Sequence, residues 1–66
     1  MIDETTIISN GDFLIDRSRE RFIVTDADAL NNKYFITPVS KVNGSDFTPE
    51  GYTIERLIRE RFRIDE

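Results

Sequence analysis

Residues 47–64, FTPEGYTIERLIRERFRI, carry the clearest helical pattern in this chain. Thr48 can accept hydrogen bonds from the free amides of a first turn, Pro49 suits the first helical position, and Glu50 complements the positive end of the helix dipole. Apolar residues then recur at the i, i+3, i+4 and i+8 spacing of one helix face, namely Ile54, Leu57, Ile58 and Phe62. The pattern predicts a helix over about 49–63 whose apolar face covers a sheet formed by the rest of the chain.

Arg61 interrupts the apolar face of this predicted helix. At about 100° per residue, its side chain projects between Ile54 and Leu57. In the simplest interpretation it lies near the helix end, with its charged head in water and its aliphatic stem on the core. The alternatives are an anchor in a partner interface, where arginine is enriched, and a buried ion pair with a sheet carboxylate, which is costly to form.

The first part of the chain predicts a three-stranded antiparallel meander. Strands are expected over about 5–9, 12–16 and 21–25, where β-branched and aromatic residues dominate. Asn10-Gly11 is a pair typical of a two-residue type I′ turn, and a second turn is expected about Ser18-Arg19. In these registers one sheet face carries the apolar residues that we assign to the helix, namely Ile8, Phe13, Ile15, Phe22 and Val24.

The opposite face of the predicted meander carries a narrower apolar stripe, formed by Ile7, Leu14 and Ile23. Asp16 and Arg21 are expected beside it as cross-strand neighbours. A sheet face that is open to water should be more polar than this one. We therefore expect a later segment of the chain, a second copy or a partner to cover the stripe.

The middle of the chain completes the predicted fold. Residues 26–31 favour a short helical turn with acids at its start, and residues 33–37 favour a fourth strand. Pro38 places that strand at a sheet edge, because proline cannot donate to a hydrogen-bond ladder. The prediction is a single α+β domain over residues 1–66, with a small antiparallel sheet, composed of a three-stranded meander and a fourth, edge strand, packed on one C-terminal helix.

The length and composition limit how such a domain is stabilised. A domain of 66 residues buries only about 60% of its unfolded surface. The chain contains no Cys and no His, so neither a disulfide nor a structural zinc site of the usual kind is available. The acidic start differs from a signal peptide, and no segment is long and apolar enough to span a bilayer. We therefore expect a complete cytoplasmic protein that does not interact with membranes.

The side-chain inventory argues against catalysis. Without His or Cys, the usual general base, the thiol nucleophile and most transition-metal ligands are missing. The Asp26-x-Asp28 pair lacks the glycine and the later glutamate of a calcium loop, and the glycines form no phosphate-binding pattern. We predict no catalytic residue, no cofactor, no metal site and no enzyme activity.

The net charge of −4 is unevenly distributed. Residues 1–16 hold four acids and no base, whereas seven of the nine bases are arginines. Arginine favours bidentate and stacking contacts. The overall acidity disfavours non-specific nucleic-acid binding, which needs a clustered positive surface.

These features favour a small non-enzymatic module that binds a protein and acts by occupying a macromolecular partner, as an inhibitor does. In composition the chain resembles the small accessory proteins of bacteriophages and mobile elements. The alternative is an assembly subunit that self-associates, as a homodimer or a larger homo-oligomer, through the same sheet face or the edge strand. A third hypothesis is nucleic-acid contact through the turn arginines, or an acidic surface that mimics DNA. The predicted partner interface comprises Ile7, Leu14, Ile23, Asp16, Arg21, Arg17, Arg19 and Arg61.

Overall fold

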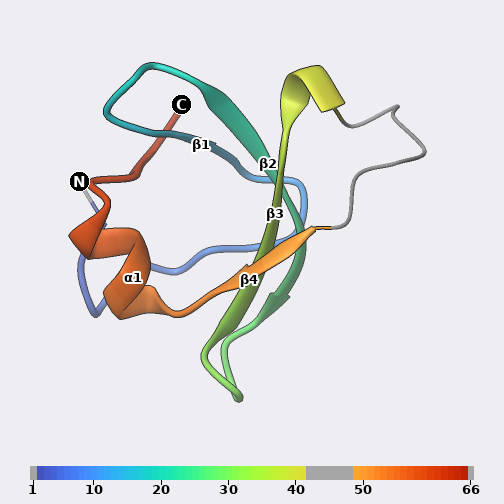
Figure 1. The fold of residues 1–66 in the computed structure, drawn as a ribbon. Helices are drawn as coiled ribbons and strands as arrows, with labels where there is room; N and C mark the ends of the chain where they lie inside the picture. Colours follow the sequence, from blue (N-terminus) through green and yellow to red (C-terminus); the bar gives the residue numbers. More distant parts are fainter. Residues whose placement is uncertain (1, 42–48, 66) are drawn as a thin grey trace.

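A computed structural model describes residues 2–41 and 49–65, which form a five-stranded antiparallel sheet and one short α-helix (Figure 1). The sheet order is β4-β3-β2-β1-β5. In chain order the elements are β1 (Phe13–Ile15), β2 (Arg21–Asp28), β3 (Lys33–Pro38), the 3-10 helix η1 (Val39–Lys41), β4 (Glu50–Tyr52), α1 (Ile54–Arg59) and β5 (Arg63–Ile64). The predicted α+β class is confirmed. The sequence analysis did not predict β4, which directly precedes α1 in the chain, or β5, which follows it.

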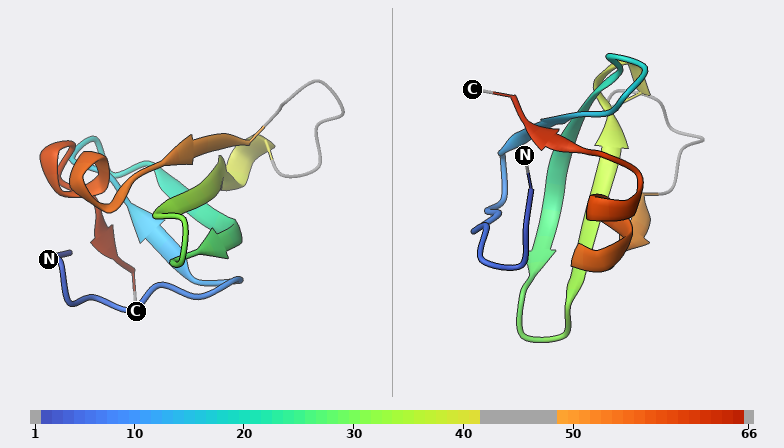
Figure 2. Two further views of the ribbon diagram at one scale, coloured as in Figure 1. Left: turned by 90° about the horizontal axis from the view of Figure 1, so that it is seen from below. Right: turned by 90° about the vertical axis from the view of Figure 1, so that its left-hand side faces the viewer.

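One core joins the sheet, the helix and the N-terminal segment. Figure 2 shows α1 and the N-terminal segment lying beside the long β2–β3 hairpin. The Phe62 ring packs edge-on against two other aromatic rings. Its centre lies 5.2 Å from the centre of the Phe22 ring and 5.7 Å from that of the Tyr52 ring. Such aromatic pairs add to the stabilisation from burial alone. The buried apolar residues are Ile2, Ile8, Leu14, Phe22, Val24, Tyr34, Ile36, Leu57 and Phe62.

The predicted strand over 5–9 is wrong, because these residues form no strand and Ile7 is 86% exposed. Asn10-Gly11 still turns the chain, but the turn is not of type I′. That type requires positive φ at both central residues, and here only Gly11 has it, at 87°. The Asn10 side chain instead accepts a hydrogen bond from the Ala27 amide at 2.6 Å. The N-terminal segment is therefore tied to β2 from outside the sheet.

The β1–β2 hairpin closes through a three-residue loop, Arg17-Ser18-Arg19. Arg19 has a φ of 67°, the left-handed position that follows a type I turn in loops of this length. The Asp16 Oδ1 atom accepts hydrogen bonds from the amides of Ser18 at 2.8 Å and Glu20 at 2.9 Å. This odd-numbered loop shifts the predicted register by one residue.

The shift moves every β1 side chain to the opposite sheet face, since neighbouring residues of a strand alternate. Leu14 pairs with Phe22 and is fully buried in the core, whereas Phe13 pairs with Ile23 on the outer face. The predicted stripe is therefore wrong. Leu14 lies in the core, Ile23 lies on the outer face, and Ile7 lies outside the sheet.

The predicted helical turn over 26–31 is also wrong. Strand β2 runs on to Asp28, which pairs with Lys33, and residues 29–32 form the turn between β2 and β3. Strand β3 is not an edge strand, because it pairs with both β2 and β4. Pro38 is the last residue of β3, so the ladder lacks an amide only at the end of the strand.

The helix is shorter than the predicted 49–63. Thr48, the expected cap, lies outside the described residues, and residues 50–52 form β4, in which Tyr52 pairs with Tyr34. Thr53 caps α1 instead, with its Oγ1 atom accepting a hydrogen bond from the Arg56 amide at 3.1 Å. The segment that was predicted as one helix thus forms β4, α1 and the start of β5.

The helix ends in a Schellman motif that has an arginine where glycine is usual. The Phe62 amide donates to the Leu57 carbonyl and the Arg61 amide to the Ile58 carbonyl, both at 3.0 Å. Arg61 has a φ of 61°. Because the helix stops here, the Arg61 side chain does not enter the apolar face and is exposed.

We expect Arg61→Gly to raise the free energy of unfolding by about 1 kcal/mol, because glycine adopts positive φ without a steric penalty from Cβ. Urea unfolding followed by circular dichroism measures the change. The matched control is Arg59→Gly, which places glycine at the last helical residue, where φ is not positive, and should lower the free energy of unfolding by up to about 1 kcal/mol. A destabilised Arg61→Gly variant would show that the Arg61 side chain contributes more than its backbone strain costs.

Candidate functional site

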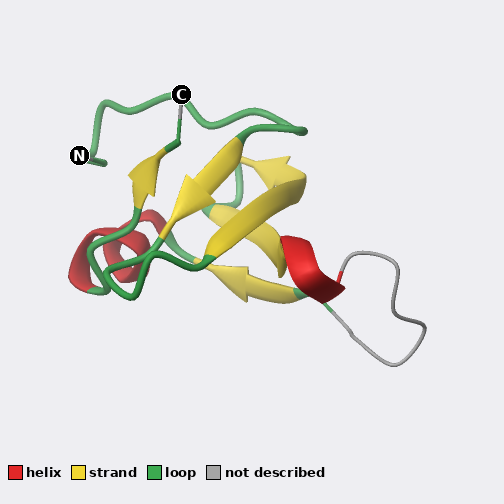
Figure 3. Ribbon diagram, turned by 90° about the horizontal axis from the view of Figure 1, so that it is seen from above, coloured by secondary structure: helices red, strands yellow, loops and turns green. Residues whose placement is uncertain are grey.

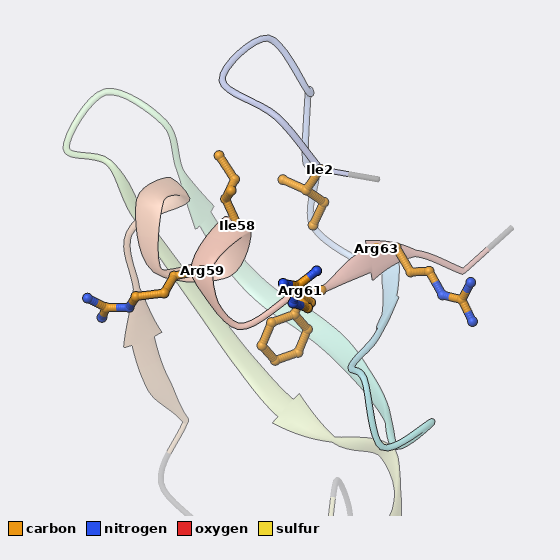
Figure 4. A pocket seen from close by; sticks show the side chains of 6 residues that line it. Ile2, Ile58, Arg59, Arg61 and Arg63 are labelled. Atoms are coloured by element: carbon orange, nitrogen blue, oxygen red, sulfur yellow. The ribbon is translucent and has the colours of Figure 1, made fainter.

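An apolar groove of about 500 Å³ lies between the N-terminal segment and the C-terminal end of α1 (Figure 4). Figure 4 shows Ile2 and Ile58 on one side of it, with Arg61 between Arg59 and Arg63, whose side chains project in opposite directions. We call this the arginine groove, and its lining consists of Ile2, Ile58, Arg59, Arg61, Phe62 and Arg63.

The floor of the arginine groove belongs to the core. Ile2 is 1% exposed and Phe62 is 4% exposed, and Phe62 is held by its aromatic contacts. Ile58 is 37% exposed and offers the accessible apolar wall. The groove therefore combines a well-packed floor with an apolar wall that is exposed to solvent.

Three local structures present the arginines of the groove. Arg59 is the last residue of α1, Arg61 is the left-handed residue that ends the helix, and Arg63 begins β5. All three are exposed. The ion pairs of the described residues join Arg21 to Asp65 and Arg56 to Glu50 and Glu60. Within residues 2–41 and 49–65, the three groove arginines therefore have no carboxylate partner.

Arg56, on the same helix, shows the contrasting arrangement. Its Nε lies 2.7 Å from Glu60 Oε2, its Nη1 lies 2.9 Å from Glu50 Oε1, and its guanidinium lies 4.2 Å from the centre of the Tyr52 ring. The hydrogen bonds to Glu60 and then Glu50 raise the pKa of Arg56 above its ordinary value. Arg56 is thus engaged within the protein, whereas no carboxylate of residues 2–41 and 49–65 pairs with the groove arginines.

The other predicted interface residues lie elsewhere. Arg21 pairs across the sheet with Ile15 and not with Asp16, so the predicted Asp16–Arg21 contact is wrong. Its Nε lies 2.7 Å from Asp65 Oδ2, and its guanidinium lies 4.8 Å from the centre of the Phe13 ring. Asp16 stabilises the β1–β2 loop by accepting hydrogen bonds from the Ser18 and Glu20 amides.

Arg17 and Arg19 are exposed in the β1–β2 loop. Because β1 pairs with β5, this loop lies at the same end of the molecule as the C-terminal strand (Figures 1 and 2). The exposed Glu20 directly follows the loop, and neither Arg17 nor Arg19 lines the arginine groove.

Of the predicted interface residues, only Arg61 lines the arginine groove. The sequence analysis missed Arg59 and Arg63, because a continuous helix places them on its solvent face. It missed Ile2 because no local pattern connects the N-terminus to the helix end. The run Arg59-Glu60-Arg61-Phe62-Arg63, with three bases around one aromatic residue, was the available signal.

A comparison of this chain with known protein families, curated proteins and solved structures finds no match. In the part of the chain that the structure describes, no helix has the length and apolar character needed to cross a membrane. Among the same residues, no three His, Cys, Asp or Glu side chains are grouped in a way that could hold a metal ion.

Proposed function

We propose that this protein is a small non-enzymatic protein-binding module that holds an acidic segment of a partner in the arginine groove. The observation that carries the proposal is the combination of three exposed arginines, unpaired within the described residues, with the exposed apolar side chain of Ile58. Such a module acts by occupying its macromolecular partner, as a small inhibitor does.

The chemistry of the groove specifies the partner segment. Guanidinium groups bind carboxylates through paired, charge-assisted hydrogen bonds, and arginine is enriched at protein interfaces. The apolar wall at Ile58 favours an apolar side chain next to those carboxylates. A partner segment with one large apolar residue between acidic residues meets both requirements. The net charge of −4 repels a long polyphosphate chain and so favours a protein partner over nucleic acid.

A fluorescent peptide with one leucine flanked on both sides by glutamates provides the test. We expect anisotropy titrations to show saturable binding to the protein, and the charge reversals Arg59→Glu and Arg63→Glu together to weaken it about tenfold. Tenfold corresponds to about 1.4 kcal/mol, which is reasonable for two exposed charge contacts. Binding should also weaken with added salt, because exposed charges are screened.

The matched control is the double variant Lys33→Glu/Lys41→Glu, which changes the net charge equally at exposed positions outside the groove. It should bind the peptide nearly as well as the unmodified protein. Peptides with alanine for leucine, or lysine for glutamate, should bind more weakly. Equal losses in both double variants would reduce the effect to net charge, and tighter binding of a single-stranded oligonucleotide would identify nucleic acid as the occupant.

A further inference from the structure

A second groove, of about 340 Å³, lies at the opposite end of α1. It is bounded by the N-terminal segment, the β2–β3 turn and the first residue of the helix. Its lining includes Glu4 and Ile7 from the N-terminal segment, Ala29 and Asn32 from the turn, and Ile54 from the helix. We call this surface the acidic end, for the charges described next. Figure 3 shows α1 as a short helix at one side of the domain.

The second groove is lined by one highly exposed large apolar side chain. Ile7 is 86% exposed, more than any large apolar residue of the arginine groove. It therefore offers an accessible apolar contact at this end of α1.

The charge at this end is negative. Glu4 is exposed in the lining, and Glu55 follows Ile54 on the helix. The Asn32 Nδ2 atom donates to Glu55 Oε2 at 2.9 Å, and this hydrogen bond lowers the pKa of Glu55 below its ordinary value. Lys33 is the exposed base next to this surface. The acidic end therefore offers carboxylates beside an exposed apolar side chain, the features that the arginine groove favours.

We propose that the acidic end of one copy of this chain docks into the arginine groove of a second copy, with Ile7 against Ile58 and Glu4 near the groove arginines. The inference rests on the proposed function, because it identifies the chain itself as a source of the acidic segment. The two surfaces lie at opposite ends of α1, so each copy uses different surfaces toward its two neighbours. Contacts of this heterologous kind generate rings or open filaments.

The small size of the domain limits the area that this contact can bury. A standard interface buries about 800 Å² on each partner, which is about a sixth of the 4797 Å² surface of this chain. A head-to-tail contact uses that share twice, once at each end of every copy. We therefore expect modest affinity, with association visible as an average mass that rises between micromolar and millimolar concentrations.

Two variants, each with one end disabled, test the proposal by multi-angle light scattering. The groove variant carries Arg59→Glu and Arg63→Glu, and the end variant carries Glu4→Gln and Ile7→Gln. Each variant alone should stay monomeric where the unmodified protein associates. An equimolar mixture should form a complex with one copy of each, because the intact groove of the end variant still accepts the intact acidic end of the groove variant. Circular dichroism confirms that both variants are folded.

Matched controls separate this contact from general charge effects. The pairs Arg17→Glu/Lys41→Glu and Glu20→Gln/Ser40→Gln make the same changes in charge at exposed positions outside both surfaces, and both should associate like the unmodified protein. The proposal is overturned if the unmodified protein is monomeric at every concentration, or if the equimolar mixture stays monomeric. A monomer that still binds the acidic peptide leaves the proposed function intact, and a monomer that does not bind it overturns both.

Discussion

Replacement of Leu14 by alanine should lower the free energy of unfolding by about 3 kcal/mol. Leu14 is 0% exposed and lies in β1 between β2 and β5, where it pairs with Phe22 and Ile64. Truncating a buried leucine removes transfer free energy and leaves a cavity, at a total cost of about 2–5 kcal/mol. A domain of 66 residues without disulfides has a stability of only about that size. Urea unfolding followed by circular dichroism should therefore show a variant that is largely unfolded even without denaturant.

The control for Leu14→Ala is Ile7→Ala, which removes the same class of side chain from a position that is 86% exposed. Its free energy of unfolding should change by no more than about 0.5 kcal/mol. The two residues belonged to one apolar stripe in the sequence analysis, so the pair of variants decides between the two registers. Equal, small effects would restore the stripe and contradict the observed pairing of Leu14 with Phe22.

The sequence did not predict the register of β1 against β2 or the residue at which α1 ends, and both depend on an arginine with positive φ. Local composition predicted strands near β1, β2 and β3, because β-branched and aromatic residues suffice to indicate them. The length of the β1–β2 loop depends on Arg19, and the end of the helix depends on Arg61. Glycine or asparagine would mark such left-handed positions in a sequence, whereas arginine does not. Local sequence patterns therefore could not predict that Leu14 faces the core or that α1 ends at Arg59.

The strand β4 was missed for a different reason. Pro49-Glu50 is a good helix start locally, but residues 50–52 gain more by pairing with β3, and a long-range contact of this kind overrides helix propensity. Gly51 is suited to this strand, because a Cβ atom there would lie 3.1 Å from Phe35 Cε1. The arginine groove depends on the same long-range arrangement, since it combines Ile2 with the residues that follow α1. For this reason the sequence identified Arg61 and not the site around it.

Asn32→Ala should lower the free energy of unfolding by about 2–3 kcal/mol, even though Asn32 is only half-buried. Asn32 has a φ of 53°, a conformation that asparagine adopts more readily than alanine. Its Oδ1 atom accepts a hydrogen bond from the Ile54 amide at 2.9 Å, which satisfies a free donor in the first turn of α1. Its Nδ2 atom donates to the Glu55 carboxylate. Alanine loses these bonds, at about 1 kcal/mol each, and adds about 1 kcal/mol of backbone strain.

Asn32→Gly separates the backbone from the side chain, because glycine adopts positive φ freely but makes none of the hydrogen bonds. It should therefore destabilise the protein by about 1 kcal/mol less than Asn32→Ala does. In both variants the pKa of Glu55 should rise toward its ordinary value, since the Asn32 hydrogen bond is the main cause of its depression. A depressed carboxyl pKa stabilises the fold above the pKa of the unfolded state, and this contribution disappears as pH falls through the folded value. The unmodified protein should therefore lose more stability on acidification than either variant, and a Glu55 pKa unchanged in an NMR titration would show that Asn32 does not link the β2–β3 turn to α1.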